Sequence, residues 1–232
     1  ERLARVRSAV DLGSPLVTQA IAVRLLGAIG EARRLRREQL KPRRDLLAEL
    51  AASGEWSTPM QGHNITEEMR AAAAHPRFAT VPASLHLDAH TAERLAATAL
   101  RVYASSDDFT ALHGVTGLAA LDALRPYLDN QLGLDRYAFQ ALAAAYLSFG
   151  APALWSEDRL GAFASSNPVP PTATEFAGAN SDDEHVAKLV YSAHRAWRSS
   201  GDPLYLAVAA RKAGLFDTRR PDRRPVARRA VS

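Results

Sequence analysis

The sequence predicts an all-α fold, an irregular array or bundle of about seven helices joined by long loops. Alanine and leucine dominate a chain that is 47% hydrophobic, and both residues lose little conformational entropy in a helix. Apolar residues recur at helical spacing in successive segments, whereas no strand pair, hairpin or internal repeat is recognisable. With 232 residues, the chain is long enough to bury one sizeable core.

The first predicted helical region spans residues 15–50. Apolar residues repeat at helical spacing before and after Pro42, at Leu16, Ala20, Val23 and Leu26 and again at Leu46, Leu47 and Leu50. The arginine-rich stretch between them, Arg33 to Arg44, is interpreted as a solvated helix face, with a phosphate or anionic-partner site as the alternative.

Two helices separated by loops are predicted next. Residues 51–65 have loop composition, and Thr66 followed by two glutamates is typical of a helix start. That helix is predicted to end near His75, before Pro76. A second loop over 76–90 leads to Thr91, the predicted cap of a helix over 92–104.

The central part of the chain predicts two more helices. Asp108 is the last of three capping residues before a helix over 109–128, and Asp135 is predicted to start another over 136–149. Residues 150–180 are predicted to be irregular, as a lid, binding loop or linker, because they contain Pro152, Pro168, Pro170 and Pro171.

The last two predicted helices have clear boundaries. Residues 181–184 (SDDE) are a strong start for a helix over 183–199. Pro203 suits the first position of a final helix over 203–214, which Gly214 would end.

Composition excludes several classes of protein. There is no cysteine, which rules out disulfides, thiolate nucleophiles and cysteine zinc sites and agrees with a cytoplasmic protein. No apolar run reaches the length of a membrane span, and no signal peptide opens the chain. Because the sequence begins at Glu1 rather than methionine, we expect its N-terminus to be trimmed, processed or incomplete.

The positive charge lies at the C-terminus. Residues 217–232 contain six arginines and two aspartates, a balance of 6 − 2 = +4, which equals the net charge of the whole chain. We therefore predict one helical domain over 1–216 and a flexible basic Arg/Pro tail over 217–232. The tail has no aromatic residue for base stacking, so nucleic-acid binding is not favoured.

Familiar site motifs are missing. The sequence has no dinucleotide-binding Gly-x-Gly-x-x-Gly, no P-loop and no Gly-x-Ser-x-Gly elbow. His86 and His90 are four residues apart, but in a predicted loop with only Asp88 nearby, so we predict no metal site.

Two segments carry residues suited to chemistry. On the helix over 109–128, His113, Thr116 and Gly117 share one face. Glycines inside a helix cost about 1 kcal/mol each and usually allow another helix or a ligand to approach closely. A buried histidine that is hydrogen-bonded at a helix crossing is the alternative interpretation.

The second segment is Asp182–Lys188 (DDEHVAK). His185 and Lys188 share a face of the helix that starts here, where a carboxylate can orient the imidazole and the lysine can stabilise an anion. The alternative is a capping aspartate beside a solvated lysine.

These segments resemble one family. Residues 108–121 (DFTALHGVTGLAAL) look like the His-Gly-[Val/Ile]-Thr helix of questin oxidase-like proteins. Residues 183–189 (DEHVAKL) and 201–210 (GDPLYLAVAA) look like its Asp-Glu-His-x-x-Lys helix and Gly-Asp-Pro ending. The resemblance covers about residues 105–214, and more loosely 60–100. The family's N-terminal half is not recognisable, so the chain is either the C-terminal part of a longer protein or a shortened relative.

The resemblance implies a helical monooxygenase of secondary metabolism. Its reaction would be a Baeyer–Villiger-type oxygenation that opens a ring of an anthraquinone-like aromatic polyketide, with no bound cofactor or flavin, O₂ as co-substrate and NADPH as a diffusible reductant. His113 would be the base, His185 and Lys188 would stabilise the developing oxyanion, and Asp183 would orient His185. The residues expected to line the substrate pocket are Thr116, Gly117, Tyr146, Phe149 and Trp155.

Two other functions stay open at this point. One is a non-catalytic binding or scaffold module that kept the fold, and the other is a binder of anionic surfaces through Arg33–Arg44 and the tail. A homo-oligomer, or a second chain that completes the site, is also compatible with the sequence. The sequence does not decide whether His113 and His185 share one pocket.

Overall fold

The protein is all-α, as predicted. The computed structural model describes residues 46–83, 85–166 and 168–216. Residues 15–45 of the helical region predicted over 15–50, the Arg33–Arg44 stretch and the tail lie outside the described residues. The described residues form ten α-helices and one short 3₁₀ helix, η1, so the estimate of about seven helices was too low. Their bounds are α3 (Leu46–Ala52), α4 (Ile65–Ala74), α5 (Thr80–Ala83), α6 (Thr91–Ser106), α7 (Phe109–Leu124), η1 (Arg125–Tyr127), α8 (Gln131–Ser148), α9 (Glu157–Ser166), α10 (Pro171–Ala179), α11 (Glu184–Ser200) and α12 (Leu204–Lys212).

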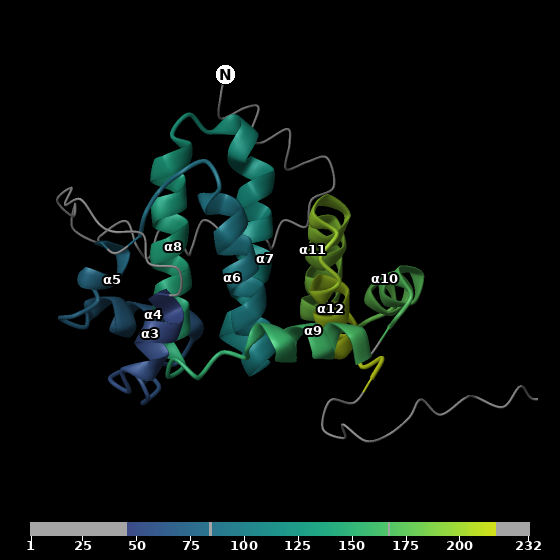
Figure 1. Ribbon diagram of the computed structural model, residues 1–232, viewed down its shortest axis with the longest axis horizontal. Helices are drawn as coiled ribbons and strands as arrows, with labels where there is room; N and C mark the ends of the chain where they lie inside the picture. Colours follow the sequence, from purple (N-terminus) through teal and green to yellow (C-terminus); the bar gives the residue numbers. More distant parts are fainter. Residues whose placement is uncertain (1–45, 84, 167, 217–232) are drawn as a thin grey trace, which may run out of the picture.

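The helices are arranged around a central group of three. Helices α6, α7 and α8 pack against one another (Figure 1). Helices α4 and α5 pack on α8, while α11 packs on α7. Helices α10 and α12 in turn pack on α11. Helix α7 therefore lies between the N-terminal and C-terminal helices of the described chain, and both can place side chains against it.

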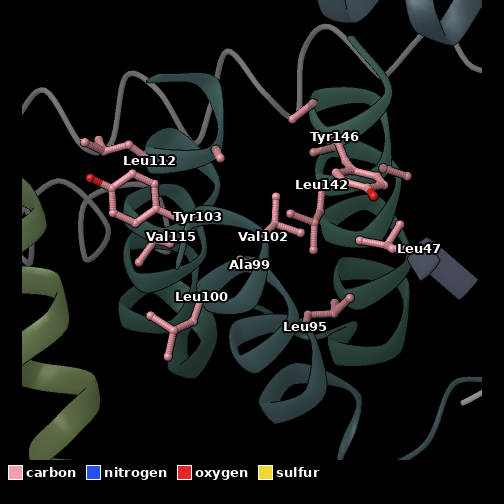
Figure 2. Packing of buried hydrophobic residues seen from close by; sticks show 14 of the residues in the cluster. Leu47, Leu95, Ala99, Leu100, Val102, Tyr103, Leu112, Val115, Leu142 and Tyr146 are labelled. Carbon is pink, nitrogen blue, oxygen red and sulfur yellow. The ribbon is translucent and has the colours of Figure 1, made fainter. Parts of the chain in front are cut away.

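The hydrophobic core has α6 at its centre. Figure 2 shows Leu95, Ala99 and Val102 facing Leu142 of α8. On another side of α6, Leu100 and Tyr103 meet Leu112 and Val115 of α7 (Figure 2). The buried hydrophobic residues form one connected cluster from Leu47 to Ala209, so the N-terminal and C-terminal helices share a core.

Several helix ends follow the predicted local chemistry. The carboxylate of Asp108 accepts hydrogen bonds from the backbone N–H groups of Thr110 (2.7 Å) and Ala111 (3.2 Å) at the start of α7. Asp183 caps α11 in the same way, by accepting from the N–H of His185 at 2.8 Å. These caps satisfy backbone donors that have no partner inside the helix.

Three predicted helix starts were wrong by one or two positions. Asn64, not Thr66, caps α4, and its side chain accepts from the N–H of Glu67 at 3.1 Å. Thr91 is the first residue of α6 rather than its cap, and its hydroxyl accepts from the N–H of Asp88 at 2.8 Å. Pro203 was predicted at the first helical position but occupies the cap position, so α12 starts one residue later than predicted, at Leu204. Asn, Thr and Pro are all common at several positions of a helix start, so composition alone does not fix the first turn.

Helix α8 begins at Gln131, five residues before its predicted start at 136. Asn130 caps it and accepts a hydrogen bond from the N–H of Gly133 at 2.8 Å. A Cβ atom at Gly133 would come within 2.4 Å of the Asn130 side chain, so the glycine leaves room for the cap to fold over the first turn. The preceding helix, α7, ends at Leu124 rather than at the predicted residue 128, and the short 3₁₀ helix η1 follows it.

The prediction that residues 150–180 are irregular was wrong for much of their length. Helices α9 and α10 lie in this stretch. The prolines mislead because Pro171 occupies the first position of α10, where the missing N–H costs no hydrogen bond. The short α5 likewise interrupts the predicted loop over 76–90.

Arg211 ties α12 to the end of α6. Its side chain is 6% exposed and donates to the backbone carbonyls of Ala104 (2.8 Å) and Tyr103 (2.9 Å). Its Nε also lies 3.1 Å from the carboxylate of Asp107. The buried cation thus gives a donor to the carbonyl of Ala104 at the end of α6 and a second donor to that of Tyr103, which also accepts from the N–H of Asp107.

Candidate functional site

Three aromatic rings from α7 and α11 meet where these two helices pack together. The ring centres of His113 and His185 are 5.4 Å apart, so the two predicted histidines do come together. Phe109, one turn before His113, lies 4.6 Å from the ring of His113 and 4.8 Å from that of His185. The contact depends on the packing of α11 against α7.

His113 is buried and has a defined orientation. Its side chain is held by a 2.8 Å contact between Nδ1 and the carbonyl oxygen of Phe109. A carbonyl only accepts, so Nδ1 carries the proton and Nε2 keeps its lone pair in the neutral ring. Within the described residues, the contact with Phe109 is the hydrogen bond that the His113 ring makes, and it leaves Nε2 without one.

Burial lowers the pKa of His113 below its usual value of 6.5. The hydrogen bond to Phe109 acts in the opposite direction, and the nearby charge of Lys188 adds to the lowering. The imidazole is therefore neutral at pH 7, with Nε2 free to accept a proton.

His185 is positioned by a carboxylate. Its Nδ1 lies 2.9 Å from Oδ1 of Asp183, the residue that also caps α11. Hydrogen bonds from the backbone N–H and the ring of His185 hold the pKa of Asp183 at about 2. Lys212 of α12 lies 3.4 Å from the other carboxylate oxygen. Asp183 is therefore ionised at neutral pH and stands where it can fix the orientation of the imidazole.

Lys188 is the most buried charge of the group. Its side chain is 6% exposed, and its Nζ lies 2.8 Å from Oε2 of Glu184, one turn earlier. The lysine lowers the pKa of Glu184. An ammonium group has three donors, so the contact with Glu184 leaves Lys188 able to contact a further oxygen atom.

Sequence reasoning missed two members of this cluster, Phe109 and Glu184. The i, i+4 spacing of Glu184 and Lys188 was a usable signal, because oppositely charged side chains at that spacing meet on a helix. Phe109 carried a weaker signal, since a ring one turn before a histidine is more often core than site. In the folded chain, Phe109 is 49% exposed.

An apolar groove lies on the other helices that surround His113. Helices α4, α7 and α8 form it, and its volume is about 30 Å³. A cavity needs ~10–15 Å³ to hold one water molecule. The groove is partly open to solvent and is lined by Ile65, Met69, Thr110, His113, Gly114, Gly117, Leu118, Leu121, Ala138, Ala141, Leu142 and Ala145.

Of the five predicted substrate-binding residues, one lines the groove and four do not. Gly117 lines the groove, whereas Thr116 is buried and its hydroxyl donates to the carbonyl of Leu112 at 3.3 Å. Tyr146, Phe149 and Trp155 are not among the lining residues.

Those three aromatic residues pack elsewhere. Tyr146 is fully buried and donates its hydroxyl to the carbonyl of Pro152 at 2.6 Å, and its ring meets that of Phe149. Trp155 packs against Phe163. A role of these residues in substrate binding stays a prediction.

Among the described residues, no group of three or more His, Asp or Glu side chains is placed to hold a metal ion. In the same part of the chain, none of the helices has both the length and the apolar character needed to cross a membrane.

Comparison of the chain with protein-family models, curated proteins and solved structures gave no match. The resemblance to questin oxidase-like proteins therefore rests on the sequence segments alone.

Proposed function

We propose that the chain is an oxidoreductase that uses O₂ to oxygenate a hydroxylated polycyclic aromatic ketone of the anthraquinone class. The observation that carries the proposal is the neutral imidazole of His113. Its Nδ1 is fixed by the Phe109 carbonyl, and its Nε2 makes no hydrogen bond with the described residues. The ring contacts that of His185, and the buried Lys188 lies on the same helix as His185. A base, two groups that stabilise an anion and a half-exposed aromatic ring are what such a reaction requires of a protein.

The substrate would enter as the two-electron reduced, hydroquinone form. Nε2 of His113 takes a proton from a phenol, and the electron-rich phenolate passes electrons to O₂, so that a carbon–peroxide bond forms. Migration of a ring carbon to the near oxygen then breaks the O–O bond, and the far oxygen leaves as water. One hydroquinone and one O₂ give one oxygenated product and one H₂O, so atoms and electrons balance.

Each charged group has a part in this scheme. Lys188 and His185 stabilise the phenolate and the developing peroxide, and Asp183 keeps His185 in its orientation. NADPH would act as a diffusible reductant that converts the anthraquinone into the hydroquinone before the reaction with O₂, and it would need no site on this chain. We propose a cytoplasmic reaction, because a chain without cysteine needs no oxidising compartment to fold.

The exposed ring of Phe109 is the proposed contact for the aromatic substrate. It lies against the rings of both His113 and His185 and offers a face or edge for stacking. The groove on α4, α7 and α8 is too small for a polycyclic ring, since drug-sized ligands occupy pockets of about 300–1,000 Å³ and its own volume is about 30 Å³.

Oxygen consumption tests the proposal directly. We expect the purified, metal-free protein to consume O₂ with reduced anthraquinones and to place one atom of ¹⁸O₂ in the product. His113→Ala should reduce the rate by about 10²–10⁴-fold, the usual contribution of a general base. His90→Ala is the matched control, because the His90 side chain is 74% exposed and lies on another helix end. Equal rates for the two variants, with both folded by circular dichroism, would remove His113 from the mechanism.

A non-catalytic binding module is the second candidate. The narrowness of the groove favours it, because an enzyme for a large aromatic substrate is expected to enclose that substrate. Saturable binding of an anthraquinone, followed by Phe109→Ala titrations, together with no O₂ uptake would support this candidate over the oxygenase.

A further inference from the structure

The groove on α4, α7 and α8 has the dimensions of a small molecule rather than of an aromatic ring system. Its residues on α7 run from Thr110 to Leu121, a length of about 16 Å at ~1.5 Å rise per residue. Small residues set its width: Gly114 and Gly117 on α7 face Ala138, Ala141 and Ala145 on α8. A Cβ at Gly114 would come 3.4 Å from Leu142, so one added methyl group already reaches the opposite wall.

The lining is almost entirely apolar. Thr110 and His113 are its two polar side chains, and both lie toward the N-terminal end of α7. A water molecule in a cavity needs two to four polar partners, whereas apolar cavities stay dry and take up xenon or benzene. Most of this groove therefore favours an uncharged apolar occupant over water.

His113 connects the groove with the cluster of charged groups. His113 is one of the residues that line the groove, and its ring also meets the ring of His185, 5.4 Å away between centres. A molecule at this end of the groove would lie against the residue that is proposed to activate the substrate.

We propose that the groove binds dioxygen and delivers it to His113. The inference rests on the proposed oxygenase function, in which O₂ is the oxidant and the hydroquinone is the reductant. O₂ is diatomic, uncharged and apolar, so it matches both the width and the lining of the groove. The partly open side of the groove provides its entrance from solvent, and the aromatic substrate binds separately, over Phe109.

Gas binding can be measured without any turnover. We expect xenon to cause saturable chemical-shift changes in the methyl groups of Met69, Ala138 and Ala145 in the ¹H–¹³C spectrum of the full chain. Under O₂ pressure, the paramagnetism of dioxygen should enhance relaxation of the same methyl groups. Ala141→Leu fills the groove and should abolish both effects, whereas Ala187→Leu, on the exposed face of α11, should leave them unchanged.

The kinetic expectation separates this inference from the proposed function. Ala141→Leu should raise the KM for O₂ roughly tenfold and leave the KM for the aromatic substrate unchanged. Gly114→Ala adds a single methyl group and should give a smaller rise, which keeps the test valid if the larger side chain prevents folding.

Different failures have different meanings. No saturable effect of xenon or O₂ on the groove methyl groups would overturn the dioxygen site and leave the His113 chemistry intact. An unchanged KM for O₂ in both Ala141→Leu and Gly114→Ala would contradict the role of the groove as the delivery route for O₂. Gas binding in a protein that shows no O₂ uptake with any reduced anthraquinone would support the site and contradict the proposed function.

Discussion

At the scale of single residues, His113 depends on where its helix lies. An exposed histidine on a helix would have both ring nitrogens in water. Here the Phe109 carbonyl one turn earlier holds Nδ1, and the charged groups that face the ring are His185, Lys188 and Glu184 of α11. Burial and the charge of Lys188 lower the pKa of His113, whereas the hydrogen bond to Phe109 and the charge of Glu184 raise it.

The lowered pKa of His113 predicts a definite pH dependence. In the unfolded chain this imidazole titrates near 6.5, and in the folded chain it titrates at lower pH. Between the two values the unfolded chain binds more protons, so the contribution of His113 to stability is fully present above pH 6.5 and is lost as the pH falls through the folded pKa. For the proposed oxygenase reaction, the acid limb of the pH profile of kcat/KM should have its midpoint below 6.5.

The Cε1–H signal of His113, followed by NMR between pH 4 and 8, measures the pKa directly. His113→Ala identifies the signal by its loss. A folded-state midpoint at or above 6.5 would contradict the argument from burial and would leave His113 partly charged at neutral pH.

At the scale of helices, the site depends on how α11 is held against α7. Helix α10 packs on the outer side of α11. At their crossing, a Cβ on Gly178 would come within 2.8 Å of both Cβ and Cγ1 of Val190. The absence of a side chain at Gly178 therefore sets the separation of the two helices.

Gly178→Ala should destabilise the protein by about 1–3 kcal/mol, the usual cost of overpacking. This effect should exceed the gain in helix propensity of up to ~1 kcal/mol. Gly161→Ala on α9 is the matched control, because a Cβ there meets nothing within 4 Å, and it should leave stability unchanged or raise it. Urea unfolding measures both.

A double-mutant cycle identifies the cause of the Gly178 effect. Val190→Ala removes the atoms that a new Cβ would strike, so it should recover much of the loss caused by Gly178→Ala. Strict additivity of the two substitutions would show that the helices do not meet closely at this point.

At the scale of the whole molecule, one core joins helices from both ends of the described chain. The buried cluster includes Leu47 and Trp56 near its start and Val208 and Ala209 near its end. Helix α7 contacts both sides, α8 and α11. Loss of either side would expose apolar surface of the central helices.

We therefore expect the two sides to unfold together. Trp56 is 2% exposed and reports on the N-terminal side, whereas Trp197 lies on α11 and packs against the same cluster. Variants that keep only one of these tryptophans should give coincident urea transitions by fluorescence. Two separated midpoints would mean that α10–α12 unfold as a unit of their own, and that the two histidines can separate without global unfolding.

The sequence by itself determined the fold class and many helix boundaries. Asp108 and Asp183 are caps whose hydrogen bonds reach only two or three residues along the chain, so their effect is readable from local sequence. Helices α9 and α10 were missed because Pro171 both breaks a preceding segment and begins the next helix. Local composition does not distinguish these roles, and packing against α11 and α12 decides between them.

Only the tertiary structure decided what surrounds the two histidines. Residues on separate helices meet according to the packing of whole helix faces, which no short-range pattern specifies. Thus His113 and His185 were foreseen as residues, but their contact and the ring of Phe109 against both of them came from the way α11 lies on α7. The groove arose in the same way: each glycine and alanine is visible in the sequence, but the space between them exists only where α4, α7 and α8 come together.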